Sequence, residues 1–554
     1  MAVIEQNKIE VSNHCFSIKG WWSADNQASG LLPAEELEDI LKDIGTNLYI
    51  VARNDKVFLA KHGNVSQRKD SSKEQFPVVA VLNGVTPDKL GDSSFCRDYN
   101  LQFPYIAGSM AHGINSKEIV KEFAINGMLA FFGTAGMPCS KIADIIDWHK
   151  DSIPDKTYGF NLIHSPNEPR LEAALVDLFL KKGVNLIEAS AYMGLSLPVV
   201  KFRVAGIHRD SAGKVVAPNR IIAKVSRVEV ATRFFSPPPE DILQKLVDSG
   251  NISKEQAEMA REIPMAQDVT AEADSGGHTD NRPAFTLIPT IIALRDQLQK
   301  KYGYSQKLRV GTGGGISTPY SAAAAFSMGA SYIVTGSVNQ GCVEAGTSDI
   351  VKEILANTGQ ADVTMAPCAD MFEMGAKVQV VKRGTMYPMR AAKLYELYKN
   401  YDSWIQIPDD QRKTIEKSFF RNTFQEIWSK TYEYFEERDS SRLVLAEKDD
   451  RYKMGLVFRW YLSQASHWAI KGDQSRKIDY QIWCGPAMGA FNQWVEGTFL
   501  EDRSQRKVIT VAANILYGAC LVLRINQLKF QGFNPEQQAV NPEKFEHIKK
   551  YFTK

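Results

Sequence analysis

The chain has 554 residues, of which 44% are hydrophobic and 23% are charged, an ordinary globular composition. Its 66 basic and 64 acidic residues leave a formal net charge of +2, too small to favour nucleic acid or an anionic membrane as a partner. Seven cysteines without a CxxC pair fit a reduced compartment better than a disulfide framework, and no zinc-site spacing is visible. Charges at Glu5, Lys8 and Glu10 interrupt the start of the chain, so we expect no signal peptide and a cytoplasmic protein. We expect no metal site.

Residues 1–76 are expected to form a small α+β module. A helix is predicted around Glu35–Lys42, and the apolar alternation in 48–60, with an Asn-Asp pair at its centre, predicts a hairpin. The polar stretch 63–75 contains few core-forming residues and is expected to be a linker.

Eight short apolar runs alternate with helical stretches in residues 77–346. In order they are FPYIAGS, GMLAFFG, YGFNLI, VNLIEA, RIIAKVS, DVTAEA, LRVGTG and YIVTGS. Eight strands with intervening helices predict an α/β fold, a closed parallel (β/α)8 TIM barrel. Helical excursions at about 190–220 and 236–263 interrupt this alternation. We expect them to lie over the barrel mouth, where the carboxyl ends of the strands meet.

After about Gly346 the strands are expected to stop. Residues 347–554 carry apolar and aromatic residues at helical spacing, which predicts a mostly helical region whose Trp and Tyr side chains lie in a core or an interface. The segment 508–525 is apolar over nearly the length of a membrane span. Polar residues within it, including Asn514 and Arg524, favour a buried helix over a membrane anchor. Such a helix is also compatible with a homodimer.

Two glycine-rich turns follow the seventh and eighth runs. The first does not match the GxGxxG dinucleotide motif, because Ile316 stands at the third glycine position. In (β/α)8 enzymes a phosphate commonly binds to these two loops, where glycine lets an anion approach backbone N–H groups. The alternative is that these glycines only serve tight turns. The residues that we assign to a phosphate site are Gly313, Gly314, Gly315, Gly336 and Ser337.

A polar loop after the sixth run, EADSGGHTDNRP, brings further groups to the same end of the barrel. A histidine taken alone is more often structural, but beside a phosphate site on a barrel mouth it is a candidate functional residue. The candidates in this loop are Asp274, Ser275, Gly276, Gly277 and His278.

The succession YIAGSMAHGI, GMLAFFGTAG, YGFNLIHSPNEP, EADSGGHTDNRP, GTGGGIS and VTGSVNQ resembles the FMN-dependent barrels of nitronate monooxygenases and flavin enoyl-acyl-carrier-protein reductases. The segments KLYELYKNYDSW, FRWYLSQASHWA and DYQIWCGPAMGAFNQWV look more closely like the PfaD type. These are stand-alone enoyl reductases that serve polyunsaturated fatty acid synthases and some polyketide synthases in trans. The resemblance runs from about Pro77 to Gln531. The leading module has no counterpart in single-domain flavin barrels.

This resemblance implies bound FMN, with its phosphate on the glycine turns and its ring system over the mouth. A lysine beside the ring would stabilise the negative charge of the reduced flavin, although Lys224 in a surface ion pair is the alternative. His278 would contact the thioester carbonyl or supply a proton. Besides the two turns and the polar loop, the residues matching positions near the flavin are Ala107, Gly108, Ser109, Met110, Asn161 and Lys224.

The activity that the resemblance implies is that of an FMN-dependent enoyl reductase. NADPH or NADH would reduce FMN, which would pass hydride to a trans-2-enoyl thioester on an acyl carrier protein, in polyunsaturated fatty acid or polyketide biosynthesis. The alternatives are a nitronate monooxygenase-type flavin oxidase and a non-catalytic docking subunit of a megasynthase. For docking of the carrier protein, the candidates are Arg203, His208, Arg209 and Arg220.

Overall fold

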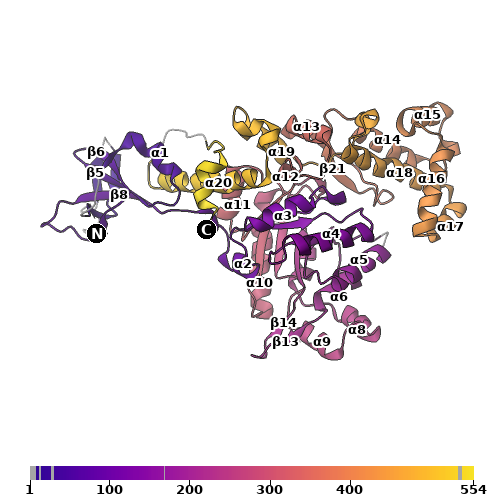
Figure 1. Cartoon of the computed structure of the whole chain (residues 1–554), viewed down its shortest axis with the longest axis horizontal. Coiled ribbons are helices and arrows are strands. Elements are labelled where there is room, and N and C mark those ends of the chain that lie inside the picture. The colour runs from indigo at the N-terminus through magenta and orange to yellow at the C-terminus, as the bar shows by residue number, and fades with distance from the viewer. Residues whose placement is uncertain (1–7, 12–13, 26–29, 167–168, 534–539, 554) are drawn as a thin grey trace. The chain divides into compact units, whose positions relative to one another are not determined.

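The structure is a computed structural model of the chain and describes residues 8–11, 14–25, 30–166, 169–533 and 540–553 (Figure 1). Residues 167–168, within the quoted motif YGFNLIHSPNEP, lie outside the described residues. The chain divides into two compact units: unit 1 comprises Met1–Ser93, Thr318–Ser327 and Thr510–Lys554, and unit 2 comprises Ser94–Ser317 and Met328–Ile509. These units do not follow the expected segments 1–76, 77–346 and 347–554. Those segments remain predictions about independently folding domains.

Unit 2 is built on a closed parallel barrel, which confirms the predicted α/β fold. The strands are neighbours in the order β10-β11-β12-β15-β16-β18-β19-β9. Seven strands fall within their predicted apolar runs and β12 extends one residue beyond its run, to Ser190. Strands covered on both faces are buried almost continuously, which makes such runs apolar. Their bounds are β9 Tyr105–Ala107, β10 Leu129–Phe132, β11 Gly159–Ile163, β12 Leu186–Ser190, β15 Arg220–Val225, β16 Asp268–Glu272, β18 Arg309–Gly313 and β19 Ile333–Thr335.

A helix follows each barrel strand along the chain, as the βα alternation predicts. α3 is an example of why these segments are helical. The Ser116 hydroxyl caps α3 by accepting a hydrogen bond from the N–H of Ile119, and the apolar face of the helix, including Phe123, is buried. The bounds of these helices are α3 Lys117–Ile125, α4 Cys139–Ser152, α5 Pro169–Lys181, α6 Leu197–Val204, α7 Val228–Phe235, α10 Ala284–Tyr302, α11 Pro319–Ser327 and α12 Ser337–Gln340.

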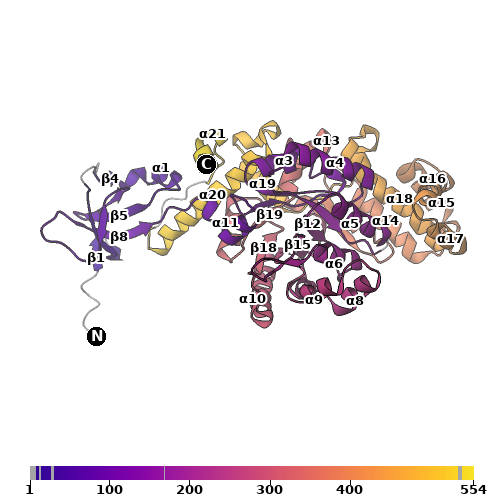
Figure 2. The ribbon, with the colours of Figure 1, turned by 60° about the horizontal axis from the view of Figure 1, so that its bottom comes forward.

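The two excursions lie at the end of the barrel opposite to the one expected. The first adds a hairpin, β13 (His208–Arg209) and β14 (Val215–Val216), between α6 and the start of β15. The second, α8 (Glu240–Asp248) and α9 (Lys254–Ala260), lies between α7 and the start of β16, and both views show these helices beside α6 (Figures 1 and 2). Because both insertions lead into the amino ends of strands, the prediction that they cover the mouth was wrong.

Arg203 belongs to the packing of this same end rather than to a docking surface. Its side chain is buried and donates hydrogen bonds to the backbone oxygens of Pro264 and Asn219. An arginine that is needed to satisfy buried carbonyls is not free to meet a partner. We therefore withdraw it as a docking candidate.

The region after the barrel is mostly helical, but the prediction that strands stop after Gly346 was wrong. β20 (Val363–Pro367) pairs antiparallel with β21 (Lys377–Val381), and β21 pairs with β17 (Gly277–His278) from the loop after β16. β20 lies close to β21 in the sequence, whereas β17 lies far away in it. The helices are α13 Asp349–Ala356, α14 Tyr387–Asn400, α15 Asp409–Thr414, α16 Phe424–Arg438, α17 Ser441–Lys448, α18 Asp450–Lys471 and α19 Ala487–Val495.

The aromatic residues of this helical region form a core, as expected. Trp428, Phe458 and Tyr461 belong to one buried cluster that also includes residues of β20, β21 and α14. The cluster therefore joins the helices to the added sheet.

Unit 1 contains a six-stranded sheet in the order β4-β6-β5-β8-β3-β7. The predicted hairpin is confirmed: β5 and β6 pair across a turn whose two central residues, Asn54 and Asp55, have φ of 49° and 55°. Part of the predicted linker is instead β7, which pairs with β3. The elements here are β3 Gly20–Ser23, β4 Leu32–Pro33, α1 Leu37–Lys42, β5 Leu48–Arg53, β6 Lys56–Ala60, β7 Asn64–Ser66 and β8 Phe76–Leu82, with a separate pair β1 Lys8–Val11 and β2 His14–Ser17.

The long apolar segment forms α20 (Val508–Phe530), which agrees with the prediction of a buried helix. It is long and apolar enough to cross a membrane, and 83% of its most apolar window is buried. Within unit 1, the Arg524 guanidinium donates hydrogen bonds to the backbone oxygens of Ile44, Thr46 and Asn83. A short helix, α21 (Phe545–Ile548), follows near the end of the chain.

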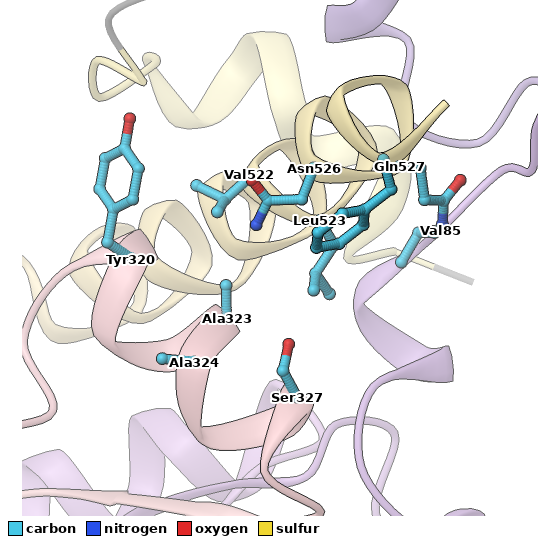
Figure 3. A pocket seen from close by; sticks show the side chains of 10 residues that line it. Val85, Tyr320, Ala323, Ala324, Ser327, Val522, Leu523, Asn526 and Gln527 are labelled. Carbon is cyan, nitrogen blue, oxygen red and sulfur yellow. The ribbon is translucent and has the colours of Figure 1, made fainter. Parts of the chain in front are cut away.

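A cavity of about 560 Å³ lies between α11 and α20 within unit 1 (Figure 3). Its walls are mostly apolar, and none of the candidate site residues lines it. The lining residues are Val85, Tyr320, Ala323, Ala324, Ser327, Val522, Leu523, Asn526, Gln527 and Phe530.

Candidate active site

A buried cluster of charged side chains lies at the barrel mouth. The Nζ atom of Lys224, on β15, lies 3.8 Å from Glu188 Oε2 on β12 and 3.5 Å from Glu272 Oε1 on β16. Ser109, just after β9, donates to Glu188 Oε2 from its N–H at 2.9 Å and from its hydroxyl. With only 14% of its side chain exposed, Lys224 is not the surface lysine of the alternative interpretation.

Burial and neighbouring charges act in opposite directions on this cluster. Burial lowers the pKa of Lys224, but the carboxylates of Glu188 and Glu272 raise it above its ordinary value. Burial raises the pKa of Glu188, which Lys224 and Ser109 only partly offset. The cluster therefore keeps a cation at the mouth beside a carboxyl group that takes up a proton more readily than an exposed glutamate.

One oxygen of the cluster has no partner. Glu188 Oε1 is buried and accepts no hydrogen bond from the residues that the structure describes. A Cβ atom on Gly108 would lie 3.6 Å from this oxygen and 2.8 Å from Val334 Cγ1, so the absence of a side chain keeps the space beside it clear. A buried polar oxygen without a donor is costly, and a bound group that carries an N–H fits this position.

The other residues predicted from the first and third runs lie on or just after β9 and β11. Ala107 is buried at the end of β9, and Met110 is partly exposed beyond Ser109. The amide nitrogen of Asn161 donates to the backbone oxygen of Glu188 at 3.1 Å and to Ser190 Oγ at 2.7 Å. The Asn161 side chain thus ties β11 to β12 directly beneath the charged cluster.

The two glycine turns follow the ends of neighbouring strands, β18 and β19. Gly314 and Gly315 have φ of 83° and 75°, which favours glycine. A Cβ atom on Gly314 would lie 2.6 Å from the carbonyl of Ala273, whereas at Gly315 and Gly336 it would meet no atom within 4 Å. The Ser337 hydroxyl accepts a hydrogen bond from the N–H of Gly485 at 3.1 Å. The turns therefore leave open space beside backbone that carries no side chain. A phosphate needs such space to approach backbone N–H groups.

The polar loop after β16 is held by the added sheet. The side chain of Gln379, on β21, donates to Asp274 Oδ1 at 2.8 Å and to the backbone oxygen of Ser275 at 2.9 Å. A Cβ atom on Gly276 would lie 2.9 Å from the backbone of Cys484, and Gly277 has a φ of 77°. Asp274, Ser275 and the two glycines therefore fix the path of the loop that ends at His278.

His278 contacts the carboxylate of Asp370, a residue that follows the barrel in the sequence. Its Nε2 atom lies 3.0 Å from Asp370 Oδ2, and Asp370 is also hydrogen bonded to Cys368. The ligand atoms of these three residues lie within 4.8 Å of one another, a spacing that suits a metal ion. However, burial raises the pKa of the Cys368 thiol, whereas a metal ligand must be a thiolate. We interpret the group as a hydrogen-bonded network.

Three residues of this site were missed from the sequence. Glu188 and Glu272 stand in the quoted runs VNLIEA and DVTAEA, and an acidic residue at the carboxyl end of a buried strand was a usable signal. Asp370 had no such signal, because it lies in a segment that was expected to be helical.

These features define a (β/α)8-barrel protein whose mouth carries a fixed cation, an unpaired carboxylate oxygen, open glycine turns and a histidine. Among solved structures, the chain is similar to the enoyl reductase domain of MlnA from the macrolactin biosynthesis cluster of Bacillus amyloliquefaciens. The TM-score is 0.76 at 40% identity, covering 80% of this chain and 99% of that domain. The chain belongs to the family of this enoyl reductase domain.

Two curated relatives are proteins of polyunsaturated fatty acid and polyketide synthesis. The chain is 43% identical over 502 residues to a polyunsaturated fatty acid synthase protein of Thraustochytrium sp., covering 89% of this chain and 33% of that protein. It is 43% identical over 452 residues to the polyketide biosynthesis protein PksE of Bacillus subtilis, covering 81% of this chain and 58% of that protein. The chain thus spans between a third and three fifths of the length of these relatives. Residues 401–480 match the family model of the inserted helical domain of acyl-carrier-protein S-malonyltransferase.

Proposed function

We propose that the chain is an enoyl reductase of the PfaD type, which depends on FMN and NAD(P)H. It reduces a trans-2-enoyl thioester carried by an acyl carrier protein, in polyunsaturated fatty acid or polyketide synthesis. The observation that carries this proposal is the 40% identity to the MlnA enoyl reductase domain over 99% of that domain. The relatives from both kinds of synthase support a partner within a multienzyme system.

The residues at the mouth fit FMN. The open space beside Gly315 and Gly336 suits the phosphate, and the unpaired Glu188 Oε1 suits an N–H of the ring system. The segment Ala107–Met110 and Lys224 would line the ring. When bound, FMN supplies the hydride transfer from NAD(P)H to the β-carbon of the enoyl group.

The protein's own groups then have defined tasks. Lys224, held between two carboxylates, offsets the negative charge that hydride transfer brings to the mouth. His278 supplies the proton for the α-carbon or polarises the thioester carbonyl. In the overall reaction the carbon–carbon double bond gains one hydride and one proton, and NAD(P)H is oxidised to NAD(P)+.

Product analysis tests this proposal. The FMN-loaded chain is incubated with NADPH and a crotonyl group on an acyl carrier protein, and the acyl group is analysed by mass spectrometry. We expect a butyryl group, two hydrogens heavier, only when NADPH is present. Turnover of a nitroalkane with oxygen in the absence of NADPH would instead support the flavin oxidase, and no turnover of either substrate would support a docking subunit.

A further inference from the structure

The carboxylate that contacts His278 is supplied by the sheet added after the barrel. His278 lies on β17, which pairs with β21 so that His278 stands opposite Val378. Asp370 lies in the loop between β20 and β21. The same three strands therefore place both the imidazole and the carboxylate, although the two residues are far apart in the sequence.

The loop that carries Asp370 is closed and packed. Backbone hydrogen bonds join Cys368 N–H to the oxygen of Ala376 at 3.1 Å and Ala376 N–H to the oxygen of Met371 at 3.3 Å. Gly375, with a φ of 72°, packs so closely that a Cβ atom would lie 2.2 Å from the hydroxyl of Tyr395 on α14. Such a loop holds its carboxylate at one position, because few alternative backbone conformations are open to it.

The contact determines which nitrogen of His278 carries a proton. An ionised carboxylate only accepts hydrogen bonds, so the 3.0 Å contact requires a proton on Nε2. The ion pair with Asp370 uses Nε2 and leaves Nδ1 of His278 outside it. Nδ1 is therefore the nitrogen left for a substrate: an acceptor when the ring is neutral and a donor when it is protonated.

We propose that Asp370 is a positioning residue: it holds the Nε2–H of His278 and favours the imidazolium, so that Nδ1–H is the group that delivers the proton. This inference rests on the proposed function for the destination of the proton, but the His278–Asp370 pairing stands apart from it. The reaction at the histidine is a simple proton transfer, in which the Nδ1–H bond breaks, a C–H or O–H bond forms on the substrate, and solvent later restores the proton.

The charges around the ring agree with this assignment. Burial lowers the pKa of His278, but Asp370, together with Glu272, raises it above its ordinary value, against a smaller opposing effect of Lys224. Partial burial raises the pKa of Asp370, whose side chain is 41% exposed, but the hydrogen bond and charge of His278 lower it to about 2. Asp370 is therefore the group whose removal should change the ionisation of His278 most.

The test compares Asp370→Asn with Glu373→Gln in the full-length protein. Glu373 is a matched control, because it is a carboxylate of the same loop that pairs with Arg459 at 3.1 Å instead of with His278. Histidine is labelled with ¹⁵N, and His278→Gln identifies the His278 signals among those of the nine histidines. The spectra report the tautomer and the pKa of His278 without any turnover.

We expect the Nε2–H tautomer in the wild type and in Glu373→Gln. In Asp370→Asn the His278 pKa should fall by about one unit or more, the usual effect of losing an opposite charge at this distance. Asp370→Glu, which keeps the charge, should restore most of that difference. The proton donor must be protonated, so enoyl reduction falls as the pH rises through the His278 pKa. In Asp370→Asn this fall should therefore begin at a lower pH than in the wild type, whereas reduction of the flavin by NADPH should be unchanged.

Two results would overturn the proposal. One is an unchanged His278 pKa and tautomer in Asp370→Asn; the other is a stoichiometric metal ion in the wild type that Asp370→Asn loses, which would make this group a metal site. A wild-type protein that shows the expected spectra but no enoyl reduction would refute the proposed function and leave the pairing of His278 with Asp370 intact.

Discussion

A carboxylate placed in the proposed phosphate cradle should expel the cofactor, and Gly336 is the position where this can be done with least disturbance. A Cβ atom there meets no atom within 4 Å, and the φ of −132° does not require glycine. Gly314 is unsuitable, because any side chain would collide with the carbonyl of Ala273 at 2.6 Å. We therefore choose Gly336→Asp, with the isosteric and uncharged Gly336→Asn as its control.

The expected magnitude follows from electrostatics. A carboxylate about 4 Å from a single phosphate charge costs ~4 kcal/mol at an effective dielectric constant of about 20. Since 1.4 kcal/mol corresponds to a factor of ten, FMN should bind about a thousandfold more weakly to the Asp variant than to the Asn variant. The comparison isolates charge, because the two side chains have nearly the same volume.

The assay is a titration of the flavin-free protein with FMN, followed by quenching of flavin fluorescence, with thermal unfolding as a check on folding. Equal FMN affinities in two folded variants would refute the placement of the phosphate at this turn. A high ionic strength should reduce the difference, because Gly315 is exposed and Gly336 is partly exposed, so that salt screens the added charge.

Three further predictions concern stability. Arg309→Met should lower the free energy of unfolding in urea by about 3–5 kcal/mol, because it leaves Asp268, which is fully buried, without its cation; an unchanged value would mean that the pair is not buried as described. Lys224→Met should lower the free energy of unfolding by about 3 kcal/mol, because it leaves the carboxyl groups of Glu188 and Glu272 without their cation. A variant that loses its flavin but is as stable as the wild type would contradict this. The Arg227 side chain lowers the pKa of Asp280 to about 2, so its contribution is present above the unfolded-state pKa of about 4 and is lost as the pH falls towards 2. Asp280→Asn should therefore narrow the difference in stability between pH 7 and pH 3, and an unchanged difference would show that this pair does not contribute.

The barrel could be predicted because each strand carries its own signal. Runs such as GMLAFFG and YGFNLI are apolar throughout, since strands of a closed parallel barrel are covered on both faces. The added sheet could not be predicted in the same way. β17 is only two residues long and pairs with β21, which is far away in the sequence. No local sequence pattern predicts such a pairing.

The residues of the candidate site also divide into those that local sequence predicts and one that it does not. The glycine turns and Lys224 stand at strand ends, where position in the sequence implies position at the mouth. Asp370 reaches the site only through the fold of the added sheet. The misplaced excursions have a simple cause: a helical pattern shows that an insertion exists, but the end of the barrel it occupies depends on whether it follows a strand or a helix.

The measurement that tests the central claim most directly is an anaerobic spectrum of the purified protein. The account predicts a visible flavin band that NADPH bleaches and that a crotonyl thioester on a carrier protein restores. A flavin band that NADPH cannot bleach would contradict the enoyl reductase in favour of an oxidase, and a protein that neither retains nor binds flavin would contradict the cofactor site itself.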